Sequence, residues 1–440
     1  MFLGVVNFIF CIILAFFEID AILGFCYTET TTMVISFSTK NYRSIKERID
    51  FSMYKRGRKR EMLQNSFHPD CLSSKQELLK SAVIYGANAS GKSNLIRAVR
   101  AMQSVVQNKG VENLSTRILL EYFKLDKESS HEPILFEMEL IARGAHYRYG
   151  FECTQEKIVS EWLYRQKKRM TLLFARVDNK FVESSPDFPE LNAWNRVIND
   201  TELSLPENML FLSTAAKVFA GGVCEAVQDW FENNLVVFSS DVYQKFLGYT
   251  LNALKDDLFS ERISTLINKA DFGIHNLTAT IDDNTEESNS LSAKVATHHI
   301  VDGTSYSLDM FFNESEGTKK VFALSAPLID ILLKGKVLFI DELDAGLHPL
   351  LVSRLLEVFH DENTKNAQII ATAHSPSLLT ETLFRRDQVW FANKLKNGVS
   401  TFVSLADFTG IRKNFSCIVK DYLHGCFGGI PYIKNLSVEK

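Results

Sequence analysis

A run of small, basic and hydroxyl residues, Gly86-Ala87-Asn88-Ala89-Ser90-Gly91-Lys92-Ser93, follows a short apolar segment of the 440-residue chain. Its two glycines allow the backbone to wrap tightly, so that the amides point at phosphate oxygens. Lys92 can then reach the β- and γ-phosphates of a nucleoside triphosphate, and the Ser93 hydroxyl can bind Mg²⁺. This P-loop pattern arises by chance in about one such chain in a hundred. The residues expected to bind nucleotide are Gly86, Ala87, Asn88, Ala89, Ser90, Gly91, Lys92, Ser93 and Asn94.

The acidic pair Asp341-Glu342 directly follows the apolar run Val337–Ile340. A strand that delivers two carboxylates beside a P-loop can complete a hydrolytic nucleotide site. Asp341 would hold the Mg²⁺ shell, and Glu342 would act as the general base for the attacking water. An acidic pair after an apolar run also occurs for purely structural reasons, so this interpretation depends on the P-loop upstream.

Two further segments contain candidate phosphate contacts. His374 follows the apolar segment that ends at Thr372, and a histidine there can reach a γ-phosphate. Ser315 and Gly317 lie in the segment Glu314–Lys319, directly before an expected helix, where a serine and a helix N-terminus suit an anion. The alternatives are structural: His374 as a surface or capping residue and Ser315 as an ordinary N-cap.

The elements around these residues indicate an α/β sheet. A strand over Ser81–Tyr85 and a helix over Lys92–Met102 flank the P-loop, as its mechanism requires. After Lys319, helical and strand patterns alternate. The expected helices are Val321–Lys334 and Pro349–His360, and the expected strands are Val337–Ile340 and Ala367–Thr372.

The rest of the chain gives weaker signals. Two short strands are expected between Met33 and Met53, and residues 133–164 resemble a β-meander. Residues 165–310 are mixed, with helical stretches near Val223–Asn233 and Tyr243–Ala270, and no sustained heptads that would build a coiled-coil arm. The basic tract Lys55–Arg60 could touch phosphates or form a solvated loop.

The first 32 residues allow three interpretations. Met1–Phe17 is uncharged and apolar but shorter than the roughly 20 residues that span a bilayer comfortably, and it lacks a basic start. We favour translation from Met33, where a strand pattern begins, over a membrane anchor or a buried helix. A membrane association is expected only if residues 1–32 are translated as part of the protein.

Composition excludes several classes of protein. The net charge is −4, from 49 basic and 53 acidic residues, so any contact with nucleic acid must be local. The hydrophobic content of 46% excludes a disordered chain. Seven scattered cysteines show no metal-binding spacing, which indicates reduced thiols and a cytoplasmic protein.

The order of these motifs resembles the ABC-type ATPases of the SMC, RecF and OLD group. The resemblance implies an α/β P-loop NTPase of ABC/SMC type: a two-lobed ATPase head with a central sheet, an antiparallel β-subdomain and an inserted mixed, mainly helical lobe. In that group ESEGTK would be a divergent signature motif, whose Ser315 and Gly317 contact the γ-phosphate held by the opposite protomer. Asp344–Pro349 matches the D-loop and His374 the switch histidine.

A closer resemblance is to the RloA-like bacterial ATPases of restriction and anti-phage abortive-infection loci. It rests on Lys40–Ile45, similar to an NFRSF opening, and on the segments SAVIYGANASGKSNL, YRYGFE, IVSEWLY, FLSTAA and FRRDQVWF. By this resemblance Arg43 becomes a candidate nucleotide contact, although an arginine in a turn is often only solvated. Two departures stand out: the chain has no clear Q-loop glutamine, and Glu314 and Glu316 replace a leucine and a glycine of the signature.

These expectations combine into one hypothesis. We expect an apolar extension (1–32), an N-terminal lobe (33–164), an inserted lobe (165–310) and a C-terminal lobe (311–440). The protein would bind and slowly hydrolyse ATP with Mg²⁺ and pair with itself, as a homodimer or higher oligomer, as a switch. Few residues follow His374, so an effector such as a nuclease is expected to act in trans.

The alternatives are a RecF-like DNA-repair ATPase and a nucleotide-binding scaffold that holds a toxin inactive. A transporter subunit is disfavoured because the chain has no multi-span domain. A GTPase is disfavoured because NKLK, at 393–396, lacks the aspartate that reads guanine.

Overall fold

The computed structural model describes residues 32–57, 62–108, 120–186, 188–201, 205–239, 243–270, 273–282, 292–409 and 415–430. The apolar segment before Thr32 lies outside these ranges, so the three interpretations of it are not tested by the structure. Residues 58–60 of the basic tract also lie outside them. The chain divides into two compact units. The P-loop unit contains residues 30–237, 335–343 and 366–440, and the second unit contains residues 238–334 and 344–365.

The central sheet of the P-loop unit has six strands in the order β11-β15-β16-β5-β17-β18. Their bounds are β5 Ser81–Tyr85, β11 Leu235–Phe238, β15 Val337–Ile340, β16 Gln368–Thr372, β17 Val389–Lys394 and β18 Ser400–Ser404. The neighbours β15, β16, β5 and β17 run parallel, so their carboxyl ends meet at one edge. Every residue of β5, β15 and β16 is buried, which explains why these strands are predominantly apolar in sequence.

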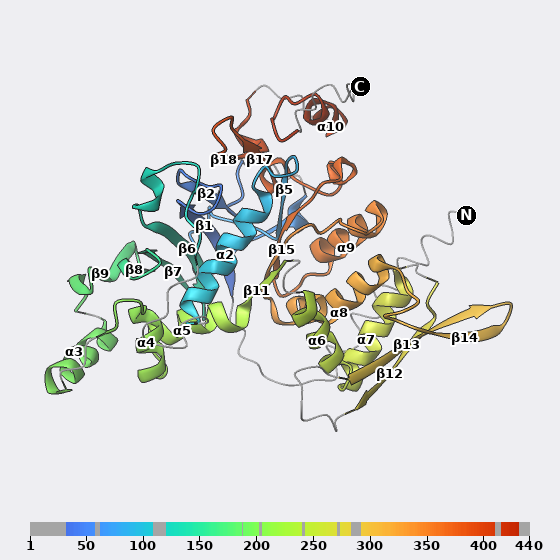
Figure 1. Ribbon diagram of the computed structural model, residues 1–440, viewed down its shortest axis with the longest axis horizontal. Helices are drawn as coiled ribbons and strands as arrows, with labels where there is room; N and C mark the ends of the chain where they lie inside the picture. Colours follow the sequence, from blue (N-terminus) through green and yellow to red (C-terminus); the bar gives the residue numbers. More distant parts are fainter. Residues whose placement is uncertain are drawn as a thin grey trace. The chain divides into compact units, whose positions relative to one another are not determined.

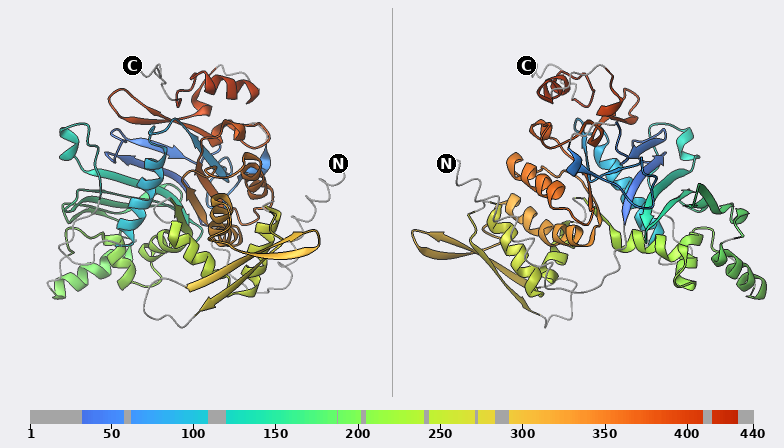
Figure 2. Two further views of the ribbon diagram at one scale, coloured as in Figure 1. Left: turned by 45° about the vertical axis from the view of Figure 1, so that its right-hand side comes forward. Right: turned by 180° about the vertical axis from the view of Figure 1, so that it is seen from behind.

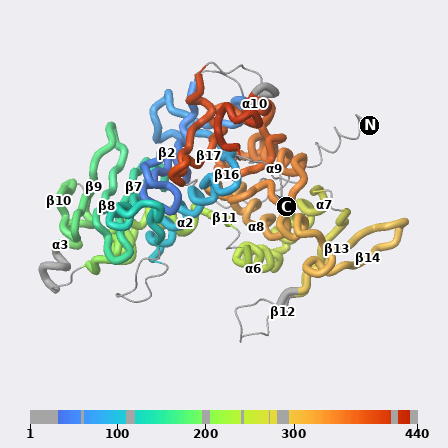
Figure 3. The backbone as a smooth tube through the Cα atoms, turned by 45° about the horizontal axis from the view of Figure 1, so that its top comes forward, coloured from blue at the N-terminus to red at the C-terminus, as the bar shows by residue number. Residues whose placement is uncertain are grey.

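A second, antiparallel sheet of seven strands has the order β10-β9-β8-β7-β6-β1-β2. Strands β7 to β10 of this sheet are labelled in Figure 3. The strands are β1 Met33–Lys40, β2 Ile49–Ser52, β6 Ile134–Ala142, β7 Ala145–Cys153, β8 Ile158–Gln166, β9 Met170–Val177 and β10 Lys180–Ser184. Strands β6 to β8 form the expected meander, and β9 and β10 extend it. Helix α2, Lys92–Val106, lies beside this sheet, and its apolar residues Leu95 and Val99 share one core with Phe136 and Tyr149 (Figure 2).

Short elements complete the P-loop unit. They are the paired strands β3 Ser66–Phe67 and β4 Leu78–Leu79, helices α3 Pro189–Thr201, α4 Phe211–Val218, α5 Val223–Asp229 and α10 Phe415–Leu423, and a π-helical turn at Trp230–Asn234. Glu161 of β8 is fully buried and accepts hydrogen bonds from the backbone N–H groups of Phe211 and Leu212, at 2.8 and 3.0 Å. Its partner is the buried guanidinium of Arg176, 2.8 Å away. This pair anchors the start of α4 to the sheet.

The second unit combines helices with a small sheet. Helices α6 Tyr243–Ala253 and α7 Asp257–Lys269 pack against α8 Glu316–Lys334, and α9 spans Pro349–Asp361. The three-stranded antiparallel sheet is β12 Asn276–Asp282, β13 Ser292–Val301 and β14 Thr304–Asp309, and the β13–β14 hairpin extends beyond α7 (Figure 1).

Two helix boundaries in the second unit differ from the sequence-based expectation. The helical stretch expected over Tyr243–Ala270 is divided, because the side chain of Asp256 accepts a hydrogen bond from Phe259 N and starts a new helix. Helix α8 begins at Glu316, five residues before the expected start at Val321. Within the described part of the chain, no helix has the length and apolarity needed to cross a bilayer.

Candidate functional site

The P-loop connects β5 to α2 in a conformation that only small residues permit. Ala89 and Gly91 have positive φ angles of 61° and 106°, which turn successive amides toward one side. A Cβ atom at Gly91 would lie 2.2 Å from Ser400 Oγ, and one at Gly86 would lie 2.5 Å from Ala392 O. Both glycines are therefore required for the backbone to approach β17 and β18 this closely.

The donors of the loop suit a polyphosphate. The buried Lys92 Nζ donates to the carbonyls of Gly86 and Ala87, at 2.6 and 3.1 Å, so its charge sits over the loop. The Ser90 hydroxyl is buried and has no hydrogen-bond partner among the described residues. The loop amides, the start of the 15-residue helix α2 and this ammonium group together form a site for negative charge.

The carboxylates of β15 meet the P-loop at the edge of the central sheet. Asp341 Oδ1 accepts hydrogen bonds from Ser93 Oγ, at 3.0 Å, and from Thr372 Oγ1, at 2.6 Å. Thr372 Oγ1 also accepts from the backbone N–H of Glu342, at 2.7 Å. One hydroxyl of β16 thus connects both acidic residues.

These donors fit a magnesium ion. Mg²⁺ prefers oxygen ligands and usually takes one or two from protein, with phosphates and water completing the octahedron. Ser93 and Asp341 provide such a pair, with Asp341 8% exposed. The described residues hold no cluster of three or more histidine, cysteine or acidic side chains that would bind a metal by itself.

Glu342 differs from Asp341 in its surroundings. Its φ angle is 52°, an unfavourable conformation for glutamate that is typical of functional sites. Its side chain is 51% exposed, and its Oε1 lies 3.8 Å from His374 Nε2. The strand therefore presents one carboxylate to Ser93 and a second, beside His374, to solvent.

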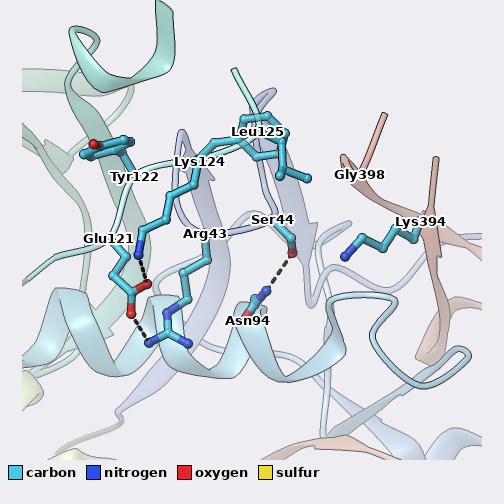
Figure 4. Close-up of a pocket in the computed structure, with 10 residues that line it drawn as sticks. Arg43, Ser44, Asn94, Glu121, Tyr122, Lys124, Leu125, Lys394 and Gly398 are labelled. Atoms are coloured by element: carbon cyan, nitrogen blue, oxygen red, sulfur yellow. Dashed lines mark hydrogen bonds and ion pairs between the residues drawn. The ribbon is translucent and has the colours of Figure 1, made fainter. Parts of the chain in front are cut away.

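A pocket of about 240 Å³ adjoins the P-loop and includes Arg43 (Figure 4). Arg43 donates to the Glu121 carboxylate at 2.6 Å, and its backbone N–H donates to Glu121 O at 2.9 Å. The neighbouring Ser44 Oγ accepts from Asn94 Nδ2, at 2.7 Å, which ties the pocket to the first turn of α2.

Ser400 extends this connection to the P-loop itself. Its hydroxyl donates to Ser90 O at 2.7 Å and lies 2.8 Å from Ser44 Oγ. Sequence reasoning missed Thr372, Ser400, Ser44 and Glu121. The position of Thr372, at the end of an apolar strand and just before His374, could have indicated a role in the site. The sequence around Ser400 and Glu121 contains no pattern that indicates such a role.

Ser315 and Gly317 belong to the second unit. Ser315 Oγ accepts from Thr318 N at 3.1 Å, so it has the geometry of an N-cap of α8. Gly317 lies in the first turn of α8, where a Cβ atom would be 2.4 Å from Gly346 O. Lys320 Nζ donates to Ala345 O at 2.9 Å, which fastens the expected D-loop to the same helix.

Comparison with known protein families assigns the chain to one of them. Residues 81–380 match the family described as "AAA domain, putative AbiEii toxin, Type IV TA system". The chain belongs to this AAA-domain family. It is therefore a member of a P-loop ATPase family, for which nucleotide binding is the common property. The expected α/β P-loop NTPase fold, with a central sheet and a separate antiparallel sheet, is confirmed.

This AAA domain is also similar to solved head domains of SMC proteins. An SMC head bound to the C-terminal winged-helix domain of ScpA is 14% identical, with a TM-score of 0.44 over 85% of this chain and 98% of that chain. The SMC head from Thermotoga maritima is 13% identical (TM-score 0.39; 84% and 98%). An SMC head with an extended coiled coil, bound to a ScpA domain derived from Pyrococcus furiosus, is 11% identical (TM-score 0.41; 89% and 99%). The search of curated proteins gives no match.

Proposed function

We propose that this protein binds ATP with Mg²⁺, hydrolyses it slowly, and uses the bound nucleotide to pair two protomers as a switch. The observation that supports this most is the connected set Ser93, Asp341, Thr372 and Glu342 beside the P-loop amides. A structural acidic pair would need no bond to the hydroxyl of the P-loop serine. Here that bond joins residues 248 positions apart in the chain.

Each residue has a distinct role in this mechanism. The loop amides and Lys92 bind the β- and γ-phosphates, and Lys92 exchanges its two carbonyl partners for phosphate oxygens. Ser93 and Asp341 hold Mg²⁺, which when bound neutralises charge on the phosphates. Glu342 accepts the proton of the attacking water, and His374 orients the γ-phosphate. The exposure of Glu342 leaves room for that water.

The Arg43 pocket is proposed to take the nucleoside end of ATP. Its volume of about 240 Å³ suits a base, and Tyr122 and Leu125 contribute apolar surface to its wall. Arg43 is held over this space by Glu121. The Ser44–Asn94 hydrogen bond makes the pocket continuous with the start of α2, where the phosphates bind.

Pairing of protomers would complete the site. We propose that Ser315 and Gly317 contact the γ-phosphate on a second protomer, since they lie at the start of the 19-residue helix α8, whose N-terminus favours anions. Glu316 at the same helix end is exposed, pairs with Lys319 at 2.8 Å and replaces a glycine of the signature, so we expect ATP-driven pairing to be weak and turnover to be slow.

The family description and the RloA-like segments suggest a biological role. We propose a cytoplasmic regulatory ATPase of an anti-phage or abortive-infection system, with an effector protein in trans. The description of the family as a putative toxin of a type IV toxin–antitoxin system supports a role of this kind.

The deciding experiment compares the full-length protein with Glu342→Gln and Lys92→Ala variants. Phosphate release and solution mass are measured with and without ATP and Mg²⁺. The wild type should release phosphate, Glu342→Gln should stall and gain mass with ATP, and Lys92→Ala should bind no nucleotide. A wild type that neither turns over nor responds to ATP in mass would refute the shared-site switch.

A further inference from the structure

Glu314 precedes Ser315 and has no role in the proposed nucleotide site, yet its side chain is only 9% exposed. Its Oε1 accepts a hydrogen bond from Thr297 Oγ1, at 2.6 Å, and lies 2.8 Å from His299 Nε2, which must donate to it. Thr297 and His299 alternate along β13 and so share one face of the small sheet. The three-stranded sheet is thus attached to the residue next to Ser315.

The segment between β14 and α8 allows little independent movement. Asp309 Oδ1 accepts from the backbone N–H groups of Phe311 and Phe312, at 2.8 and 3.0 Å, and Asn313 Oδ1 accepts from Asp309 N at 2.9 Å. This closed turn leads directly to Glu314, and the next residue caps α8. A displacement of β13 therefore reaches Ser315 through one peptide unit.

The hydrogen bonds to Glu314 are needed because the carboxylate is nearly enclosed. A buried carboxylate that loses its donors must rotate toward water or remain unsatisfied. Either outcome changes the backbone that carries Ser315. Thr297, with no exposed surface, and His299, at 19% exposed side chain, are held in place by the sheet itself.

We propose that Thr297 and His299 are positioning residues, which act through Glu314 to set Ser315 and Gly317 for the nucleotide of a second protomer. The inference rests on the proposed function, because it concerns the same shared site. It assigns the β12–β14 sheet the task of holding the α8 N-terminus ready for pairing.

The test uses full-length His299→Gln, Glu314→Gln and the corresponding double variant. His298→Gln is the matched control, since His298 is the adjacent residue on β13 and its Nε2 pairs instead with Thr278 Oγ1, at 2.8 Å. Three quantities are measured: the Kd of a fluorescent ATP analogue, the ATP-dependent gain in mass, and kcat. Thr297→Val, which removes only a hydroxyl from the cluster, is the second variant in case His299→Gln fails to fold.

Each glutamine keeps a hydrogen-bonding amide but changes the geometry or the charge of the contact between His299 and Glu314, and either variant should lower kcat and ATP-dependent pairing about tenfold. The analogue Kd should remain within about twofold, because the P-loop supplies that affinity. The double variant should be no worse than Glu314→Gln alone, since that change already affects the contact with His299. Thr297→Val should change the same two quantities, and His298→Gln none.

Two results would overturn the inference and are distinguishable from failure of the proposed function. If His299→Gln and His298→Gln have equal kcat and equal ATP-dependent pairing, then His299 has no positioning role, and the proposed switch is unaffected. A Kd that rises in parallel with the loss of kcat would show a general structural role. A wild type that binds the analogue but never gains mass with ATP would refute the shared site itself, and this inference with it.

Discussion

Replacing Thr372 with valine removes one hydroxyl from the centre of the site and keeps the shape of the side chain. In the wild type this hydroxyl donates to Asp341 Oδ1 at 2.6 Å and accepts from Glu342 N at 2.7 Å, and Thr372 has no exposed surface. Valine satisfies neither group. Asp341 then keeps Ser93 as a donor, whereas the Glu342 N–H loses this acceptor.

The size of the effect follows from these two bonds. A hydrogen bond to a charged group contributes about 1.5–3 kcal/mol, and one between neutral groups contributes about 0.5–1.5 kcal/mol. We therefore expect Thr372→Val to lower the free energy of unfolding of the P-loop unit by about 3 kcal/mol. Because Glu342 has a positive φ angle, loss of its N–H partner also lets its carboxylate move. Misplacement of a reacting group by about 1 Å costs about 100-fold in rate.

The assay combines urea denaturation with ATP turnover at saturating Mg²⁺. Thr372→Ser is the control, since it retains the hydroxyl and should keep turnover close to that of the wild type. Nucleotide affinity without Mg²⁺ should be unchanged in both variants, because Thr372 does not contact the loop amides. If Thr372→Val matches Thr372→Ser in both stability and kcat, then the hydroxyl does not connect the two carboxylates in the way described.

Two further substitutions test the contacts that hold the P-loop unit in its folded form. Gly429→Ala should weaken ATP binding, because Gly429 has a φ of 69° and its Cβ would lie 3.3 Å from Gly86 Cα; the left-handed backbone alone costs about 1–2 kcal/mol. Glu161→Gln should lower stability by about 3–5 kcal/mol in a denaturation experiment, since it leaves the guanidinium of Arg176, 1% exposed, without its counter-ion.

Each of these two variants has a matched control, which separates loss of the specific contact from a general loss of stability. Gly221→Ala introduces the same backbone cost at a φ of 79° with no atom within 4 Å of the new Cβ, so ATP affinity should not change. If both glycine variants weaken ATP binding equally, the contact with Gly86 is irrelevant. Asp178→Asn breaks an exposed ion pair with Lys157 and should leave stability unchanged. A Glu161 variant as stable as this one would refute the role of the buried pair.

The central site could be predicted because its chemistry fixes residue types and their order. The P-loop glycines, Lys92 and the acidic pair are recognisable without the fold, and the buried strands β5 and β15 are visible in the sequence as short, mainly apolar runs. The bonds between them could not be predicted. Thr372 reaches Asp341 only because β15 and β16 pair in parallel with Ile340 beside Ala371, and register is a property of the assembled sheet.

Other features could not be predicted from the sequence because tertiary packing determines them. The C-terminal segment approaches the P-loop at Gly429, where a Cβ atom would lie 3.3 Å from Gly86 Cα, and no sequence pattern indicates this contact. Two consecutive glycines with positive φ, Gly428 and Gly429, make this approach possible. The pairing of Arg43 with Glu121 joins distant positions and leaves no local pattern. Strands β9 and β10 were not foreseen in a region that was expected to be mainly helical.

The position of β5 in the central sheet has a consequence for synthesis of the chain. Its neighbours are β16 and β17, so Ser81 pairs with Ile369 and Ile84 with Trp390. At about 5–20 residues per second, a ribosome needs roughly 15–60 s to make the roughly 290 residues between the paired segments. Throughout that time the five residues of β5, four of them apolar, have no partner strand on either side, a condition that favours aggregation. We therefore expect the central sheet to assemble only after the segments of β16 and β17 have been synthesised.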